Sequence, residues 1–346
     1  MFYCGLDVAL KSSYLYLTDA QGRKKTGGEV ATEQAALTAR LRPYLRGGLA
    51  VALEAGNQSA WLHDLLVELG AQVTVVNPAK LKLIAESRRK TDKIDAQILC
   101  ELLRLAGLPH PVHIPPPATR ALRGLLVARR QLVTTRVKLA NVARGLLRQE
   151  GTRLASQALM TFVGWQRLLA QEYRLSHLKP VLAAYYESFQ ALTHSIQALD
   201  RQLAERERQD ARAARLKTMP KVGRIAALTF LAAVDQVDRF PTSRKLIGYS
   251  GLAPTVRSSG ERTQYGAISR QGRAELRGVW VQIAHLVARD TNKASAPLRK
   301  WYSRVAYHRG KKTAIVALAR KLLTIAYRLL RDETVYDAAR LRKRAA

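Results

Sequence analysis

The sequence predicts an α/β domain followed by all-α segments. Over residues 1–108, short apolar runs alternate with amphipathic stretches, which is the pattern of strands and helices in turn. A proline-rich segment, PHPVHIPPPA, interrupts the chain at residues 109–118, and beyond it apolar residues recur at helical spacing. A chain of 346 residues, 47% of them hydrophobic, can bury a substantial core in two or three domains. We expect three domains, at residues 1–108, 109–210 and 211–346.

The N-terminal domain is expected to contain five strands. The runs FYCGLDVA and SSYLYLTDA predict a strand and its hairpin partner, and a third strand follows Gly22 and reaches Val30. A helix from about Thr32 to Leu45 precedes the buried strand GLAVALEA. The amphipathic helix QSAWLHDLLVELG precedes the strand QVTVVN, and Pro78 begins another helix. The order β-β-β-α-β-α-β-α is that of a ribonuclease H-like fold, although other α/β folds also permit it.

Helices dominate the structure expected after the proline-rich segment. Residues 118–149 predict one long basic helix, and residues 216–234 predict two helices joined by a Pro-Lys-Val-Gly turn, as in a helix-hairpin-helix module. Residues 248–266 are rich in Gly and Ser and predict a loop or a short hairpin. Three further helices are expected at about 270–289, 295–308 and 311–331.

Residues 182–203 carry an apolar stripe in a 3-4-3-4 spacing. Its members are Phe189, Leu192, Ile196, Leu199 and Leu203. The spacing is typical of a short coiled coil. A helix that packs on its own domain shows the same stripe, and over so few heptads the sequence favours neither interpretation.

The charge of the chain points to a polyanionic partner. Lys and Arg number 58 against 26 Asp and Glu, which gives a net charge of +32 and a pI near 10.8. Between Glu101 and Glu150 there are nine bases and no acid, and between Asp290 and Asp332 there are eleven bases and no acid. A solvated surface normally mixes both signs. Single-sign stretches of this length favour nucleic acid, whose binding is driven largely by counterion release from the phosphates.

Two other classes of protein are disfavoured. The two cysteines, Cys4 and Cys100, fit neither a disulfide framework nor a zinc site, and we interpret them as reduced thiols. No apolar run approaches the ~20 residues that a membrane span needs, and the N-terminal residues do not resemble a secretory signal. We expect a cytoplasmic protein.

Four carboxylates are candidate catalytic residues. Asp7 lies inside an apolar strand and Glu54 ends another, and a buried carboxylate is costly unless it is paired or bound to a metal. Asp92 and Asp95 are three apart at the start of a helix, so they share one face. Their simpler interpretation is an N-cap and a favourable charge in the first turn, which suits Asp92 better than Asp95.

Together these carboxylates form an Asp-Glu-Asp-Asp set, and all of their ligand atoms are oxygens. Such sets suit Mg²⁺ or Mn²⁺, and paired ions can activate the attacking and leaving oxygens of a phosphodiester. The basic run Arg88, Arg89 and Lys90 directly precedes the two aspartates and could hold a phosphate strand beside the ion. Arg129 and Arg130, in the acid-free helix, are further candidate phosphate contacts.

Several segments resemble, in order along the chain, the DEDD-type transposases of bacterial insertion sequences, now described as bridge-RNA-guided recombinases. They are GLDVALKSS, ALEAG, VNPAKLKLIAESRRKTDKIDA, MPKVGRIAALTFLAAV and RKLIGYSGLAPTVRSSGERTQYGAISRQGRAELR. The most specific parts are K-T-D-x-I-D-A and the later G-L-x-P…S-S-G…G-x-I-S-x-x-G. The resemblance covers most of the chain.

This resemblance implies a RuvC-like nuclease domain, a helical coiled-coil middle and a mostly helical C-terminal transposase domain. It assigns Asp7, Glu54, Asp92 and Asp95 as the metal-binding tetrad for Mg²⁺ or Mn²⁺. It also implies donor and target DNA as substrates, a noncoding guide RNA as partner, and a homo-oligomer, either a dimer or a tetramer in the synaptic complex. The active sites of the family are built across protomers. The protein would then be bacterial and nucleoid-associated.

The resemblance further implies a serine nucleophile just before the glycine of the S-G motif. In this sequence that residue is Ser259, and Ser258 takes its place if the register differs by one. A serine attack on DNA gives a phosphoserine link that conserves bond energy for rejoining. Tyr265 is the next candidate nucleophile. The arginines near enough in sequence to steady the phosphate are Arg257, Arg262 and Arg270.

The chain departs from the family pattern at two places. After Glu54 it has Ala55-Gly56-Asn57, where relatives often carry Thr-Gly or Cys-Gly. The turn usually written Pro-Gly-Val-Gly is here Pro220-Lys221-Val222-Gly223, which alters a backbone phosphate contact or strengthens it.

Two alternatives remain open at this point. A metal-dependent nuclease of the junction-resolvase kind would need the tetrad but not Ser259, and it would form no covalent adduct with DNA. A non-catalytic nucleic-acid-binding protein would use the carboxylates structurally and would cleave nothing.

Overall fold

The computed structural model describes residues 1–81, 91–170, 176–259 and 262–339. The chain forms two compact units, Met1–Pro115 and Pro116–Ala346. The boundary lies within the proline-rich segment that the sequence marked. Residues just before it pack on the first unit, because the N–H of Val112 donates to the carbonyl oxygen of Val75 at 2.7 Å. The division into three domains stays a prediction.

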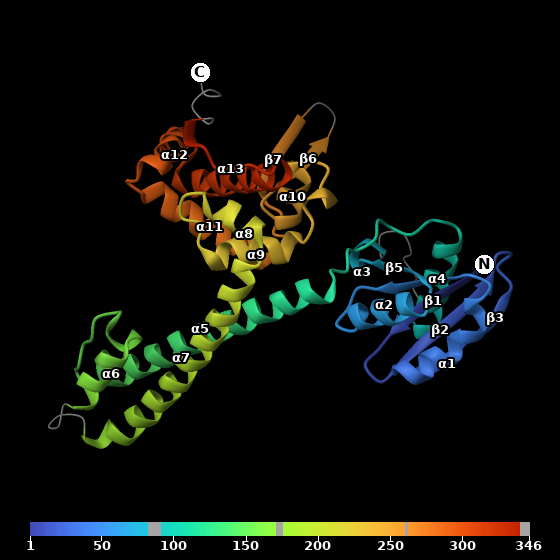
Figure 1. Cartoon of the computed structure of the whole chain (residues 1–346), viewed down its shortest axis with the longest axis horizontal. Coiled ribbons are helices and arrows are strands. Elements are labelled where there is room, and N and C mark those ends of the chain that lie inside the picture. Colours follow the sequence, from blue (N-terminus) through green and yellow to red (C-terminus); the bar gives the residue numbers. More distant parts are fainter. Residues whose placement is uncertain (82–90, 171–175, 260–261, 340–346) are drawn as a thin grey trace. The chain divides into compact units, whose positions relative to one another are not determined.

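The first unit is built on a mixed five-stranded sheet in the order β3-β2-β1-β4-β5 (Figure 1). β1 pairs antiparallel with β2 and parallel with β4, so it occupies the centre of the sheet. The strands are β1 (Phe2–Val8), β2 (Ser12–Asp19), β3 (Lys24–Ala31), β4 (Leu49–Glu54) and β5 (Gln72–Val76). The strands and helices follow the predicted element order, and the mixed five-stranded sheet is consistent with a ribonuclease H-like domain.

Helices cover both faces of this sheet. α1 and α2 pack on one face around a core that includes Leu6 and Leu53, and α4 packs on the other face. The helices are α1 (Gln34–Leu45), α2 (Ser59–Glu68), α3 (Pro78–Leu81) and α4 (Asp92–Arg104). Cys4 and Cys100 are free and buried, as expected for reduced thiols.

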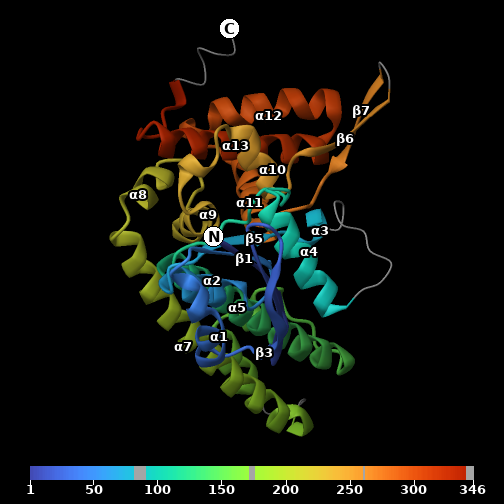
Figure 2. The same cartoon turned by 90° about the vertical axis from the view of Figure 1, so that its right-hand side faces the viewer.

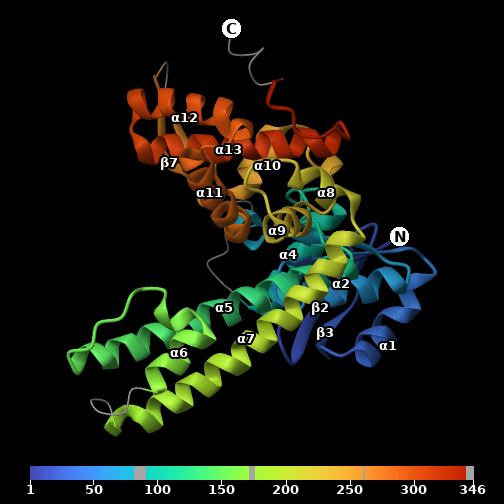
Figure 3. The same cartoon turned by 60° about the vertical axis from the view of Figure 1, so that its left-hand side comes forward.

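The second unit begins with two long helices that lie side by side (Figure 3). They are α5 (Pro117–Gln149) and α7 (Lys179–Arg208), and the shorter α6 (Phe162–Leu169) packs against them. Three of the five stripe residues of α7, Phe189, Ile196 and Leu203, are buried within the chain. Phe189 packs with Trp165 and with Ala143 of α5. Of the two interpretations of the stripe, packing on its own domain accounts for the contacts in this structure.

The remainder of the second unit is a helical bundle around a buried helix, α9. Residues 226–234 of α9 are all buried, as a helix that is apolar on every side requires. Phe230 of α9 meets Trp280 of α11 edge-on at 5.5 Å. The helices are α8 (Ala211–Lys217), α9 (Arg224–Val234), α10 (Ser243–Ser250), α11 (Ala274–Arg289), α12 (Ala296–Arg309) and α13 (Lys311–Arg331). Short 3₁₀ turns occur at Ala158–Met160, Ser176–Leu178, Val237–Arg239 and Lys293–Ser295.

One two-stranded hairpin interrupts the bundle. β6 (Pro254–Ser259) and β7 (Arg262–Ile268) pair antiparallel, and the hairpin projects from the helices (Figures 1 and 2). The sequence predicted either a loop or a short hairpin for this segment, and the structure contains the hairpin.

Candidate catalytic centre and nucleic-acid interface

Asp7 and Glu54 lie at the carboxyl ends of two neighbouring parallel strands. The pairing of β1 with β4 runs from Phe2 opposite Leu49 to Leu6 opposite Leu53, so the next residues along the two strands are Asp7 and Glu54. Side chains alternate along a strand, and Leu6 and Leu53 face the α1–α2 core. Asp7 and Glu54 therefore share the opposite face, the one that α4 covers. Both are half-buried.

Helix α4 lies directly on β1 because the strand has a glycine at the crossing point. A Cβ on Gly5 would lie 1.9 Å from the carbonyl oxygen of Ala96 and 2.6 Å from the backbone nitrogen of Cys100. The Cys100 thiol donates to the carbonyl oxygen of Tyr3 at 3.2 Å. Ala96 thus lies over residue 5 and Cys100 over residue 3, so α4 runs antiparallel to β1. Its N-terminus points toward the end of β1 that carries Asp7.

The first turn of α4 holds the other two candidate carboxylates. Thr91 is the N-cap, and its hydroxyl accepts the N–H of Ile94 at 3.3 Å. Asp92 is therefore the first helical residue and not the cap. Asp92 is exposed and Asp95 is half-buried, and both charges lie where the helix dipole favours them. The prediction that Asp92 is the N-cap is thus wrong. A favourable interaction of Asp92 and Asp95 with the helix dipole is compatible with a catalytic role for both.

Strand register places Asp7 and Glu54 side by side at the carboxyl ends of β1 and β4. Because α4 runs antiparallel to β1, its first turn, which holds Asp92 and Asp95, lies toward the same end of the sheet. The donor set is made only of carboxylate oxygens, which fits Mg²⁺ or Mn²⁺. Among the residues that the structure describes, no group of three or more His, Cys, Asp or Glu is gathered closely enough to hold an ion. Arg88, Arg89 and Lys90 lie outside the described residues.

Ser259 is the last residue of β6 and stands at the tip of the β6–β7 hairpin. It pairs with Arg262 across the hairpin, and Ser258 pairs with Thr263. Gly260 and Glu261, which connect the strands, lie outside the described residues. Tyr265 pairs with Val256 farther from the tip and is 73% exposed. The backbone of Ser259 therefore lies at the end of a projecting element.

The base of this hairpin is held by backbone contacts. The N–H of Arg270 donates to the carbonyl oxygen of Gly251 at 3.2 Å, and both residues have positive φ, 56° and 72°. Gly272 also has a positive φ, and a Cβ there would lie 2.1 Å from the carbonyl oxygen of Tyr249. Arg270 thus belongs to the base, about 25 Å along the strand from the tip. Among the three candidate arginines, Arg257 and Arg262 are the two on the strand ends beside Ser259.

The arginines at the centre of α5 have partners within the chain. The Nε of Arg129 lies 2.6 Å from Asp200 Oδ1 on α7, and its Nη2 lies 3.2 Å from Asp200 Oδ2. Arg130 lies 3.6 Å from Glu275 of α11. A role for either residue in nucleic-acid binding stays a prediction, and any substitution of either also removes an intramolecular ion pair.

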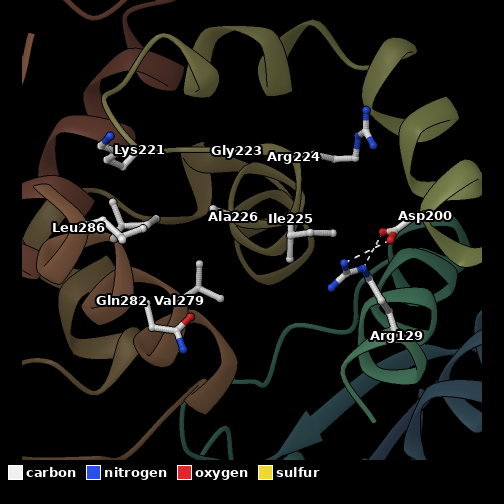
Figure 4. A pocket seen from close by; sticks show the side chains of 11 residues that line it. Arg129, Asp200, Lys221, Gly223, Arg224, Ile225, Ala226, Val279, Gln282 and Leu286 are labelled. Atoms are coloured by element: carbon white, nitrogen blue, oxygen red, sulfur yellow. Dashed lines mark hydrogen bonds and ion pairs between the residues drawn. The ribbon is translucent and has the colours of Figure 1, made fainter. Parts of the chain in front are cut away.

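The Pro-Lys-Val-Gly turn between α8 and α9 borders a cavity of about 490 Å³ (Figure 4). Lys221, whose φ is 62°, lies 2.9 Å from Asp290, and Arg224 pairs with the buried carboxylate of Glu207. Hydrogen bonding from Ser295, and then from Lys221, lowers the pKa of Asp290. A positive φ is a conformation that glycine adopts more readily than lysine. Here the lysine charge is shared with a carboxylate and is not wholly directed at solvent.

In the described part of the chain, no helix combines the length and the apolar character needed to cross a membrane.

Comparison with known proteins identifies the family of the chain. Residues 4–151 match the model of a DEDD-type transposase of the IS110 group, described as "Transposase", and residues 213–299 match the model described as "Transposase IS116/IS110/IS902 family". The first match covers the ribonuclease H-like domain with α5, and the second covers α9 to α11 and the serine hairpin.

Curated relatives agree with these matches over most of their length. A "Probable family 20 transposase" of Pseudomonas aeruginosa is 29% identical over 292 residues, which is 83% of this chain and 85% of the relative. The "Transposase for insertion sequence element IS1111A" of Coxiella burnetii is 27% identical over 84% of this chain and 80% of its own length. The "Insertion element IS116 uncharacterized 44.8 kDa protein" of Streptomyces clavuligerus is 25% identical over 97% of this chain and 96% of its own length. The chain therefore belongs to the DEDD-type transposases of insertion sequences, which are enzymes.

Proposed function

We propose that this transposase is an RNA-guided DNA recombinase that cuts and rejoins strands through a serine-linked intermediate. Its substrates are donor and target DNA, and its partner is a noncoding guide RNA. The observation that supports the proposal is the placement of Asp7 and Glu54 at the carboxyl ends of β1 and β4, with the first turn of α4 lying toward the same end of the sheet. The family membership supports it.

Asp7, Glu54, Asp92 and Asp95 are the residues that would hold a divalent cation. When bound, Mg²⁺ or Mn²⁺ would neutralise charge that develops on the phosphate during strand transfer. The two strand carboxylates are fixed by sheet register, whereas Asp92 and Asp95 depend on the position of α4. Gly5 and Thr91 therefore serve the site as positioning residues, the first by letting the helix approach and the second by fixing where it begins.

Ser259 supplies the nucleophile in this proposal. Its hydroxyl oxygen attacks the phosphorus of one phosphodiester, and the bond from that phosphorus to one flanking sugar oxygen breaks. The proton of the serine is transferred to the leaving oxygen, which becomes a free hydroxyl. The attack of a hydroxyl from the exchanged strand on the phosphoserine reverses these bonds and regenerates Ser259. No external energy source is needed because the number of phosphodiester bonds is unchanged.

The nucleic-acid partners are supported by the charge distribution. Both acid-free segments fold as helices, α5 in one case and α12 with α13 in the other. Long helices with bases and no acids are suited to phosphate backbones, which both DNA and RNA present. We propose a homo-oligomer in which each active site combines residues of two protomers. Phe189, Ile196 and Leu203 of the α7 stripe are buried within the chain, so the stripe is not needed to explain a contact between protomers.

Substitution of Asp95 by Asn tests the metal site, and substitution of Glu101 by Gln is the matched control. Both residues are carboxylates of α4, and Glu101 lies in a later turn of the same helix. We expect the Asp95→Asn protein to lose strand exchange while its affinity for DNA is unchanged or higher, because a negative charge has been removed. The Glu101→Gln protein should recombine normally. Normal strand exchange by Asp95→Asn would remove Asp95 from the site.

The nuclease alternative differs from this proposal in one observable. A junction-resolvase-like enzyme would cleave with the same carboxylates and would leave no protein attached to DNA. Denaturing electrophoresis of a reaction with end-labelled DNA separates the two, because only the serine mechanism gives a band with the mass of protein plus strand. The non-catalytic alternative does not agree with membership in an enzyme family.

A further inference from the structure

The tip of the α12–α13 pair combines high positive charge with an exposed aromatic ring. The two helices lie side by side and join at Gly310, whose φ is 80° (Figures 2 and 3). Between Asp290 and Asp332 the chain has eleven Lys and Arg and no acid. Among the described residues, none of these eleven bases forms an ion pair with a carboxylate from another part of the chain.

One side of α12 is directed at solvent and is basic. Lys300, Arg304, Tyr307 and His308 are all exposed, and their spacing of four, three and one places them on one helical face. The opposite side packs on the bundle through Leu298, which is fully buried. The exposed face of α12 therefore does not contribute to the packing of this helix on the bundle.

Bases on α13 add to this positive surface. Burial lowers the pKa of Lys321, and the nearby charges of Arg304 and Arg328 lower it further. The Lys321 ammonium lies 4.8 Å from the ring centre of Trp301. In the described part of the chain, none of these three bases forms an ion pair with a carboxylate. Positive charge without an opposing carboxylate favours the binding of a polyanion.

Tyr307 is the most exposed of the large apolar residues of the described chain. Its side chain is 87% exposed, whereas Phe230 and Trp280 of the same bundle are fully buried. Among the described residues, the Tyr307 ring contacts one other ring, that of His308, edge-on at 5.1 Å and 85°. Arg309, Lys311 and Lys312 follow within five residues and are exposed. An aromatic face open to solvent among unpaired bases is the arrangement with which proteins bind single strands.

We propose that the tip of the α12–α13 pair binds unpaired nucleic acid, with the Tyr307 ring stacked on a nucleobase and Arg309, Lys311 and Lys312 neutralising the flanking phosphates. A base in a duplex is already stacked on both faces, so the ring selects a strand that is open. The inference rests on the proposed function for the step of the reaction at which an open strand is available to bind. In a recombinase guided by pairing, open strands occur in the loops of the guide RNA and in the DNA strand that pairing displaces.

Affinity for single strands tests this inference without any need for strand exchange. The probes are a single-stranded DNA and a single-stranded RNA of the same mixed sequence, each with one 2-aminopurine, and the corresponding DNA duplex. Tyr307→Ala should weaken binding of the single strands about 5- to 150-fold, which is the cost of losing one base–aromatic stack, and should leave duplex affinity unchanged. Tyr307→Phe keeps the ring and should bind as the wild type does.

Two further readouts separate stacking from charge. The fluorescence of 2-aminopurine should be quenched by the wild type and by Tyr307→Phe, and not by Tyr307→Ala. Substitution of both Lys311 and Lys312 by Ala should lower the slope of log affinity against log salt by about 1.4 for a single strand, whereas Tyr307→Ala should leave that slope unchanged. If Tyr307→Ala loses affinity for RNA alone, the ligand is the guide RNA. If it loses affinity for DNA alone, the ligand is the displaced strand. If it loses affinity for both, the site binds any single strand.

Equal losses on duplex and single strands, or a Tyr307→Phe protein as weak as Tyr307→Ala, would overturn the inference. So would unchanged affinity of Tyr307→Ala for both single strands. These results leave the proposed function untouched, because they concern where strands are held and not how they are cut. Conversely, a protein that binds single strands through Tyr307 but exchanges no DNA would retain this site and lose the proposed function.

Discussion

Substitution of Gly5 tests directly whether the packing of α4 on β1 positions the candidate catalytic carboxylates. Replacement by Ala puts a Cβ 1.9 Å from the carbonyl oxygen of Ala96, and such contacts are essentially never shorter than 3.0 Å. The obstacle is helix backbone, which has no rotamer to change, so α4 must move away from β1 by about 1 Å. Asp92 and Asp95 move with the helix, whereas Asp7 and Glu54 stay with the sheet.

The size of the effect follows from this displacement. Overpacking of a well-packed core typically costs about 1–3 kcal/mol, which for a unit of 115 residues lowers Tm by roughly 5–15 °C. A displacement of about 1 Å between catalytic groups can lower the rate about 10²-fold. The charge of the protein is unchanged, so affinity for DNA should be unchanged. We therefore expect strand exchange to fall about 100-fold at a temperature where the variant is still folded.

Strand exchange, DNA affinity and Tm are the three measurements, and Gly56→Ala is the matched control. Gly56 lies two residues after Glu54, and a Cβ there would have no atom within 4 Å, so its substitution should alter none of the three. The reasoning is refuted if Gly5→Ala protein that is shown to be folded recombines at the wild-type rate. It is also refuted if the loss of activity equals the unfolded fraction, since the helix displacement then contributes nothing.

Three further predictions concern subunits, the turn before α9 and acid stability. If active sites combine two protomers, a mixture of Asp95→Asn and Ser259→Ala proteins should regain cleavage. The DNA adduct should then be on the Asp95→Asn subunit, which keeps Ser259. Verified mixed dimers that do not cleave would show that each site is formed within one subunit. Lys221 has a φ of 62° and an ion pair with Asp290, so Lys221→Ala loses the pair and keeps the strain. Lys221→Gly should then be about 1 kcal/mol more stable to denaturant than Lys221→Ala, and equal stability would contradict the account of the turn. Burial acts to raise the pKa of Asp19, but the Arg23 backbone and the Lys25 and Arg23 side chains outweigh it and hold the pKa at about 2, below the unfolded value of 3.8. The stability that this depressed pKa contributes is present above pH 3.8 and is lost as the pH falls toward 2. Between pH 3.8 and 2, the free energy of unfolding should therefore fall less for Asp19→Asn than for the wild type. Identical profiles of free energy against pH would show that Asp19 contributes nothing.

Much of the first unit could be predicted because its signals are local. Alternation and apolar runs located all five strands, and their order gave the ribonuclease H-like topology. The neighbouring positions of Asp7 and Glu54 could not be predicted from the sequence, because the register between β1 and β4 is set by the packing of both faces of the sheet. The direct approach of α4 had a signal in Gly5, a glycine within an otherwise apolar strand, which often marks close approach of another backbone.

The second unit shows where local signals are insufficient. The stripe of α7 has coiled-coil spacing, but Phe189 packs with α5 and α6 of the same chain and Leu203 packs in the core around α9. Periodicity alone cannot identify such partners. Likewise the sequence predicted Arg129 of α5 as a candidate phosphate contact but gave no sign of its ion pair with Asp200, a residue 71 positions away. Isolated ion pairs between distant residues leave no trace in a single sequence. The position of Asp92 was misjudged for a smaller reason, because the N-cap is the preceding Thr91.

The central claim is that DNA becomes joined to Ser259 during strand exchange. Its most direct test is mass spectrometry of the peptide attached to DNA after wild-type protein, guide RNA, Mg²⁺ and labelled donor DNA are mixed and the reaction is stopped by denaturation. We predict one adduct, with the phosphate on Ser259, which is absent from Ser259→Ala protein and absent when Mg²⁺ is removed by a chelator. Cleaved DNA without any attached peptide, or an adduct on Ser258 or Tyr265, would contradict the claim.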